Sequence, residues 1–188
     1  MASKINLISN ALILIGDLPI NSLTGNTRAQ QVATNLYDNI AQNELSKFRW
    51  GFARKKAQLA LTTIIPVDDE FSSVYQLPSD LLVLTTVRPN GRYQLYGDKV
   101  HTTFNGALTA DYQYNALESE WPPYFAKMME YALAKDFATS IRDSSASRAE
   151  MTSEYAIASR MARFSDSQQH PQYFADIFPP LAATVCVC

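Results

Sequence analysis

The sequence has few of the residues on which catalytic and metal centres usually depend, with two cysteines and two histidines among its 188 residues. Cys186 and Cys188 lie at the end of the chain and cannot cross-link a domain, which is typical of folding in a reducing cytoplasm. Neither His101 nor His170 has neighbours at the spacing of a metal site or a catalytic triad. The six glycines are scattered and form no phosphate-binding loop. We therefore expect no cofactor, no metal and no catalytic residue.

Charge and hydrophobicity are both moderate. The formal net charge is −2 and the pI about 5.7, which argues against nucleic-acid binding over the whole surface but leaves room for a local basic patch. The longest apolar run, Ala11 to Ile15, is far too short to cross a membrane. The polar N-terminus MASKINLISN is unlike a signal peptide, so we expect no membrane partner. With 47% apolar residues, the chain can bury one substantial core.

Residues 27–56 predict a long helix that leads into a strand. Thr27, or Asn26 before it, can cap the helix, and Gly51 favours its end because glycine costs roughly 1 kcal/mol inside a helix. From Lys56 to Thr62, apolar and polar residues alternate as in a half-buried strand. The apolar stripe of the helix consists of Ala29, Val32, Ala33, Leu36, Ile40 and Phe48.

Three aromatic residues, Phe48, Trp50 and Phe52, surround Gly51 at the end of this helix. We interpret them as the joint between a helical layer and a β layer. Basic residues alternate with these rings, a pattern that can also form a nucleic-acid surface. Because the whole chain is acidic, we favour the interpretation in which the cations complement the negative end of the helix dipole. The basic residues are Lys47, Arg49, Arg54, Lys55 and Lys56.

Three further helices are predicted. Ser3 can cap the first helix and Gly16 can end it. Proline is favoured in a first helical turn, so another helix begins within residues 121–123 and breaks at residues 143–145. A last helix is predicted over residues 147–165. In the helix that begins within residues 121–123, the expected buried face is Phe125, Met128, Met129, Ala132, Leu133, Phe137 and Ile141. In the helix over residues 147–165, it is Met151, Tyr155, Ala158, Met161 and Ala162.

The middle of the chain predicts an antiparallel β meander. Short β-rich segments are separated by turn sequences at residues 89–91, 97–98 and 105–106. Asn105-Gly106 between alternating segments is the strongest short-range signal for a hairpin, so we expect consecutive strands to pair. After the first strand, the predicted strands are residues 73–77, 82–87, 92–96, 99–104 and 107–114.

Glu118 and Glu120, with Asp111 upstream, suggest the carboxylate pair of a glycosidase. Two glutamates two residues apart, however, point in different directions on a helix or a strand. Their position just before a predicted helix suits carboxylates that complement its positive end. We therefore favour a structural role over catalysis.

The last part of the chain, residues 166–188, predicts an extended arm. Three prolines within it exclude a long helix, yet the segment is too apolar for a solvated linker. One interpretation is that the arm wraps back over its own helices. We favour contact with another chain, which would receive the large apolar side chains in pockets. Those residues are Tyr173, Phe174, Ile177, Phe178 and Leu181.

Together these patterns predict an α+β fold, a four-helix bundle with an inserted antiparallel β-meander subdomain and an extended C-terminal arm. The bundle takes its first half from residues 1–54 and its second half from residues 119–165. The β subdomain comprises residues 55–118, and the arm comprises residues 166–188.

Four short motifs follow one another along the chain. They are Ile15-Gly16-x-x-Pro19, Trp50-x-Phe52, Leu77-Pro78-Ser79-Asp80 and the aromatic–proline sequence Trp121-Pro122-Pro123. In this order they resemble the tail tubular protein A family, the head-to-tail adaptors of short-tailed bacteriophages. The resemblance covers residues 5–165, whereas the tail beyond Gln168, which ends in VCVC, departs from the family pattern.

The resemblance implies a structural virion protein and no enzyme. It implies a homo-oligomeric ring of about a dozen subunits below the portal protein, with double-stranded DNA passing through the lumen without sequence-specific binding. The helical bundle would meet neighbouring subunits and the portal, and the β subdomain would face the downstream tail or nozzle protein. Apolar residues outside the main helical stripes could supply a second contact face. They are Ile13, Tyr37, Leu45, Tyr131 and Ile157.

Two other functions stay open. One is a peptidoglycan-cleaving tail hydrolase, which would need Glu118 or Glu120 in a cleft with a raised pKa. The other is a small cytoplasmic DNA-binding α+β domain that uses the basic cluster between Lys47 and Lys56. A ring would have a mass of several hundred kilodaltons, whereas both alternatives would be small.

Overall fold

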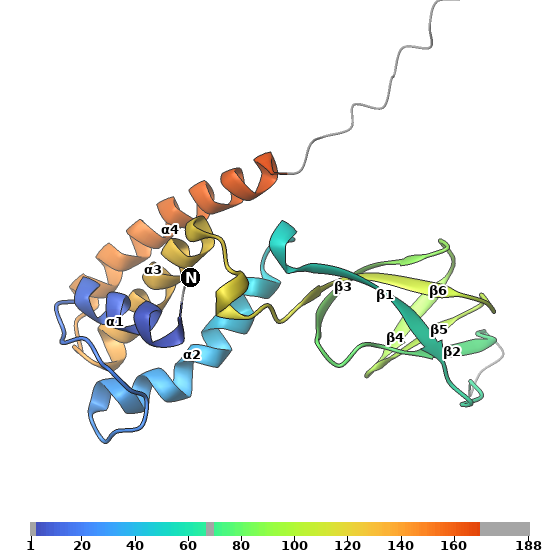
Figure 1. Cartoon of the computed structure of the whole chain (residues 1–188), viewed down its shortest axis with the longest axis horizontal. Coiled ribbons are helices and arrows are strands. Elements are labelled where there is room, and N and C mark those ends of the chain that lie inside the picture. The colour runs from blue at the N-terminus through green and yellow to red at the C-terminus, as the bar shows by residue number, and fades with distance from the viewer. Residues whose placement is uncertain (1–2, 67–69, 170–188) are drawn as a thin grey trace, which may run out of the picture.

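The computed structural model describes residues 3–66 and 70–169, which form a helical lobe and a β lobe (Figure 1). The helices are α1 (Lys4–Leu14), α2 (Arg28–Ser46), α3 (Pro123–Ser140) and α4 (Ser145–Gln168). The strands are β1 (Arg54–Leu61), β2 (Ser73–Gln76), β3 (Leu81–Arg88), β4 (Tyr93–Tyr96), β5 (Lys99–Thr102) and β6 (Leu108–Tyr114). Two short 3₁₀ helices, η1 (Gly51–Ala53) and η2 (Glu118–Glu120), lie where the chain passes between the lobes. The protein is therefore α+β, as its sequence predicts.

Short-range signals in the sequence set the helix ends. Ser3 caps α1 with its hydroxyl group, and Gly16 follows the end of that helix with a φ of 75°, a conformation that favours glycine. Thr27, and not Asn26, caps α2. Its hydroxyl group accepts a hydrogen bond from the Gln30 N–H, and the side-chain oxygen of Gln30 accepts one from the Thr27 N–H. These ends confirm the predicted boundaries of α1 and the predicted start of α2. The predicted end of α2 near Gly51 is wrong, because the helix ends at Ser46 and Phe48 lies beyond it.

The helix α3 is the centre of the helical lobe, because α1, α2 and α4 all pack against it. Its predicted buried face is confirmed, except that Ile141 is only half-buried. The helix α4 begins at Ser145, with Ser144 as its cap, and so starts before the predicted Ser147. It also continues to Gln168, past the predicted end at residue 165. Of its predicted buried face, Met151 and Ala162 are buried and Tyr155 and Ala158 are half-buried. Met161 is 58% exposed, so its predicted burial is wrong, because the buried side of the helix lies along Met151, Ser159, Ala162 and Asp166. Among the described helices, none has the length and hydrophobicity needed to cross a membrane.

The buried face of α2 differs from the predicted stripe. Tyr37 and Leu45, expected to form part of a second contact face, are 1% and 0% exposed and belong to the core. Leu36 and Ile40 from the predicted stripe are only half-buried. The reason is that residues at four-residue spacing, from Ala33 through Leu45, form a row that faces the core. The prediction that Tyr37 and Leu45 contact other subunits is therefore wrong.

The β lobe is an antiparallel six-stranded sheet with the order β3-β6-β1-β2-β5-β4, so the predicted meander is wrong. The strand β1 links two halves of the sheet: its first residues pair with β6 and its last two pair with β2. The last strand of a meander would lie at an edge, whereas β6 is buried along most of its length and takes an inner position. Asn105-Gly106 forms no hairpin. Instead, the Tyr75 hydroxyl group donates a hydrogen bond to the Gly106 C=O and accepts one from the Gly106 N–H.

Candidate functional site

The aromatic joint lies where the chain leaves α2 and enters β1. Trp50 is 1% exposed, and its ring lies edge-on to Phe48 at 5.0 Å and to Phe125 of α3 at 4.9 Å. Phe52 and Trp121 also contact Phe125, at 4.9 and 5.0 Å between ring centroids. The structure thus gathers Trp50, Phe52 and Trp121 around one ring of α3, and Phe48 joins this cluster through its contact with Trp50. Edge-on pairs of this kind add about 0.5–1.5 kcal/mol each to the effect of burial.

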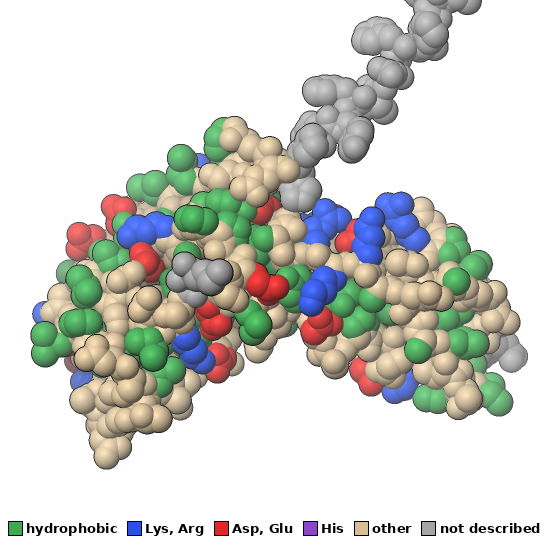
Figure 2. All heavy atoms as spheres, in the orientation of Figure 1, with side chains coloured by type: hydrophobic (Ala, Val, Ile, Leu, Met, Phe, Trp, Pro, Cys, Tyr) green, Lys and Arg blue, Asp and Glu red, His purple; other side chains and the backbone are tan. Residues whose placement is uncertain are grey.

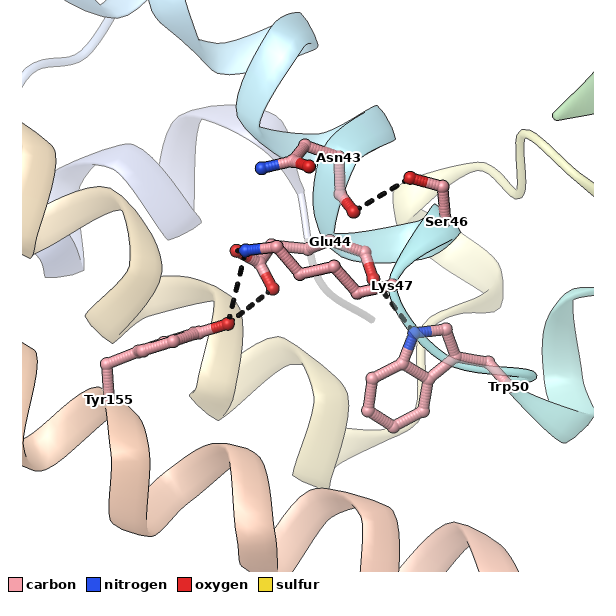
Figure 3. Close-up of polar contacts among 6 residues, drawn as sticks. All are labelled: Asn43, Glu44, Ser46, Lys47, Trp50 and Tyr155. Atoms are coloured by element: carbon pink, nitrogen blue, oxygen red, sulfur yellow. Dashed lines mark hydrogen bonds and ion pairs between the residues drawn. The ribbon is translucent and has the colours of Figure 1, made fainter. Parts of the chain in front are cut away.

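A buried carboxylate ties this joint to α4 (Figure 3). The backbone carbonyl of Glu44 accepts a hydrogen bond from Trp50 Nε1 at 3.0 Å. The carboxylate of Glu44 accepts bonds from Lys47 Nζ at 2.6 Å and from the Tyr155 hydroxyl at 2.7 Å. Burial raises the pKa of Tyr155, and its bond to Glu44 adds to this effect. Burial lowers the pKa of Lys47, but the bond and charge of Glu44 raise it above its usual value overall.

A second buried carboxylate, Asp166, fixes the other end of the joint and forms a clamp, which consists of its bonds with Gly51 and Tyr124. It lies in the last turn of α4, and its two oxygens accept bonds from the Gly51 N–H at 3.1 and 2.9 Å. One of these oxygens also accepts a bond from the Tyr124 hydroxyl at 2.8 Å. Burial raises the pKa of Tyr124, and Asp166 raises it further. The predicted arm began at residue 166, but this residue belongs to α4 and holds the joint.

The β lobe contributes Gln113, a buried residue of β6, to the same joint. Its amide donates to the backbone carbonyls of Leu45 at 3.1 Å and Phe48 at 2.5 Å. These carbonyls are at the end of α2, where helical partners are missing. Gln113 therefore connects the sheet directly to the helical lobe.

Three of the five basic residues near the joint form ion pairs with acidic residues of the same chain. Figure 2 shows Lys and Arg side chains gathered where β1 leaves the joint. Part of this cluster lines a shallow hollow of about 350 Å³. Within the described residues, Arg49 and Lys56 form no ion pair. The pairs are Lys47 with Glu44, Arg54 with Asp111 and Lys55 with Asp80.

The acidic residues considered for catalysis have separate partners. Glu120 accepts a bond from the Leu117 N–H at 2.9 Å within η2. Glu118 lines a hollow of about 350 Å³ between α2 and the segment around η2, and Glu120 is not part of its lining. Asp111 is paired with Arg54 at 2.9 Å in the sheet. No cluster of His, Cys, Asp and Glu that could hold a metal ion occurs in residues 3–66 and 70–169.

The remaining predicted residues fall in two places. His101 lies in β5, where it contacts the rings of Phe71 and Tyr96 at 6.1 and 4.8 Å between centroids. The arm residues lie outside the described part of the chain. They are Tyr173, Phe174, Ile177, Phe178 and Leu181.

Sequence reasoning found the rings of the joint and missed its polar residues. Glu44 and Asp166 lie in helices that also carry many exposed polar side chains, so nothing local marks them as buried. Gln113 alternates with tyrosines in β6 and could have been noticed as a polar residue in an aromatic strand.

Neither a protein-family model nor a curated protein matches this chain. Function therefore has to be inferred from the joint and from the surfaces that the two lobes expose.

Proposed function

We propose that the chain is a structural head-to-tail adaptor of a tailed bacteriophage. It forms a homo-oligomeric ring of about a dozen subunits below the portal protein, and the genome passes through its lumen. The four helices act as the bundle that meets neighbouring subunits and the portal, and the β lobe faces the downstream tail or nozzle protein. The protein is assembled in the host cytoplasm and resides at the head–tail interface of the virion.

The observation that carries the proposal is that both lobes expose apolar side chains. On the helical lobe, Met161 and Phe164 of α4 are each 58% exposed. On the β lobe, Leu61 and Ile64 are about half-exposed at the end of β1, and Ile65 is 85% exposed. Uncovered apolar patches commonly mark contact surfaces. Their presence on opposite lobes suits a protein that joins partners on two sides.

The polar and aromatic joint supports the same function. An adaptor must hold its two contact surfaces at a fixed separation, and independent lobes would not do so. Asp166, Gln113 and Trp50 connect α4, the sheet and α2 through buried contacts. Such buried hydrogen-bonded contacts restrict motion between the lobes. The mild acidity of the chain also suits a DNA conduit, because a strongly basic lumen would retain DNA.

The residues after 169 have a place in this proposal. In it, the arm residues Tyr173, Phe174, Ile177, Phe178 and Leu181 contact the portal or a neighbouring subunit. The support is their composition, since within residues 170–188 only Asp176 carries a side-chain charge apart from His170.

The test is the assembly state of the purified chain. Sedimentation velocity and negative-stain electron microscopy should show rings of several hundred kilodaltons as the concentration rises. A chain that stays monomeric up to about 1 mM, which corresponds to association weaker than roughly 4 kcal/mol, refutes the ring. A reproducible peptidoglycan-clearing activity that is lost in the Glu118→Gln, Glu120→Gln double variant would favour the hydrolase instead.

A further inference from the structure

An apolar row lies on the outer face of α4. Ile157, Met161 and Phe164 recur at four- and three-residue steps, so they lie on one side of the helix. All three are more than half exposed, and Figure 2 shows hydrophobic side chains along this outer edge of the helical lobe. The buried residues of α4, such as Met151 and Ala162, lie on its other side, toward α3. No described residue covers the row.

A groove runs along α1 and α3 on the same lobe. It consists of two neighbouring hollows of about 550 and 420 Å³, which share Asn10, Lys127 and Glu130 as lining residues. Apolar side chains from both helices, among them Leu7 and Ile13, form much of the rest of its wall. A groove between two helices can accept the side chains of a third helix by ridges-into-grooves packing.

We propose that the outer face of α4 docks into the α1–α3 groove of a second copy of this chain. The shapes fit, because an exposed row of large apolar side chains meets an open groove with an apolar wall. A charged contact is also available at the edge of the groove. Glu150 and Glu154 precede the row and form no ion pair within the described residues. Lys127 is paired with Glu130 at 3.0 Å, but its side chain stays 55% exposed at the groove and can reach a second carboxylate.

This contact joins two different surfaces, so it is heterologous. A heterologous contact forms a ring when its rotation closes. The inference rests on the proposed ring and names the surfaces through which its subunits meet. A twofold contact between the α4 faces of two copies would give a dimer and no ring.

Cross-linking between single-cysteine variants tests the contact. In the full chain carrying Cys186→Ser and Cys188→Ser, one variant adds Ile13→Cys in the groove and another adds Met161→Cys on α4. With a short bismaleimide, the mixture should form cross-linked dimers, and neither variant alone should do so. A third variant, Thr152→Cys, is the control, because Thr152 is exposed on α4 outside the row. Mixed with Ile13→Cys, it should give at most about a tenth of the yield.

Each other outcome overturns the inference in a distinguishable way. Cross-linking of Met161→Cys alone would identify a twofold α4 contact. Rings without the cross-link between positions 13 and 161 would overturn this interface and leave the proposed function standing. A chain that is monomeric at every concentration would overturn both.

The effect on affinity provides a second measurement. Met161→Asp should raise the dissociation constant for self-association at least tenfold, as followed by sedimentation velocity. The matched variant Thr152→Asp adds the same charge to the same helix and should leave it unchanged. Both side chains are exposed, so both variants should keep the melting temperature of the parent. Equal self-association of the two variants contradicts the docking of α4.

Discussion

Trp50 is the residue whose removal should affect the fold most. Replacing a buried aromatic residue with alanine typically costs 3–5 kcal/mol, because the cavity collapses only in part. Here the indole also makes edge-on contacts with Phe48 and Phe125, and its N–H satisfies the carbonyl of Glu44. An unsatisfied buried acceptor costs roughly 1–3 kcal/mol. We therefore expect Trp50→Ala to lower the free energy of unfolding by about 5 kcal/mol, a large part of the 5–15 kcal/mol typical of a native protein.

Urea unfolding followed by far-UV circular dichroism measures this loss through the shift of the midpoint at constant slope. The control is Phe164→Ala, which removes an aromatic ring that is largely exposed on α4 and should change stability by at most about 0.5 kcal/mol. Trp50→Phe should fall between the two, since it keeps part of the ring packing and loses the hydrogen bond. If Trp50→Ala is too unstable to purify, the comparison of Trp50→Phe with the control still decides. A loss below about 1 kcal/mol in Trp50→Ala would refute the burial of Trp50 at the joint.

Three further predictions concern the clamp, alkaline stability and the arm. Asp166→Ala should cost about 2 kcal/mol in urea unfolding because it leaves two partly buried donors, the Gly51 N–H and the Tyr124 hydroxyl, unpaired, and Asp166→Asn should cost less; equal losses would contradict the clamp. Burial, reinforced by the bond to Asp80, raises the pKa of Tyr112 to about 12 from 10.0, so its stabilising effect is present below pH 10 and lost as the pH rises through 12. Tyr112→Phe should therefore lose less stability than the parent as the pH rises from 10 to 12. If both proteins lose the same stability over this range, Tyr112 is not the source of the alkaline loss. Deleting residues 171–188 should leave the melting temperature nearly unchanged and weaken ring assembly, whereas normal assembly would exclude the arm as a connector.

Sequence reasoning succeeded where the determinants lie within a few residues of each other. Ser3 and Thr27 cap their helices through bonds that span three residues, and Gly16 adopts the positive φ that ends α1. The buried face of α3 could be predicted because the helix is apolar on the side that every other helix contacts. These features need no knowledge of the remaining chain.

The order of the strands could not be predicted, because turn signals say only that the chain reverses. Gly97-Asp98 does join the paired strands β4 and β5, whereas Asn105-Gly106 carries the chain from β5 to β6 without pairing them. The difference depends on distant contacts, such as the hold of Tyr75 on Gly106 across 31 residues of sequence. The same limit explains Tyr37 and Leu45, whose burial depends on how α2 lies against the rest of the lobe.

The polar half of the joint escaped prediction for a related reason. Glu44 and Asp166 are acidic residues in amphipathic helices, and such residues normally face water. The Gly51 N–H, which satisfies the buried carboxyl group of Asp166, lies 115 residues away in the sequence. A buried carboxyl group of this kind is recognised only when its partners are known.

The two faces of α4 connect the joint with the proposed contact between copies. Asp166 on the inner face holds the start of η1 and thereby the strand β1, while Phe164, two residues earlier in the same helix, is exposed on the outer face. A subunit docked on the outer face would therefore be fixed relative to the β lobe of its neighbour as well as to its helices. In a ring built this way, the order of the helical lobes would set the orientation of every β lobe. Loosening the clamp with Asp166→Ala should then leave the contact on α4 in place and spread the orientations of the β lobes, which two-dimensional classes of assembled rings would show as blurred density on one side.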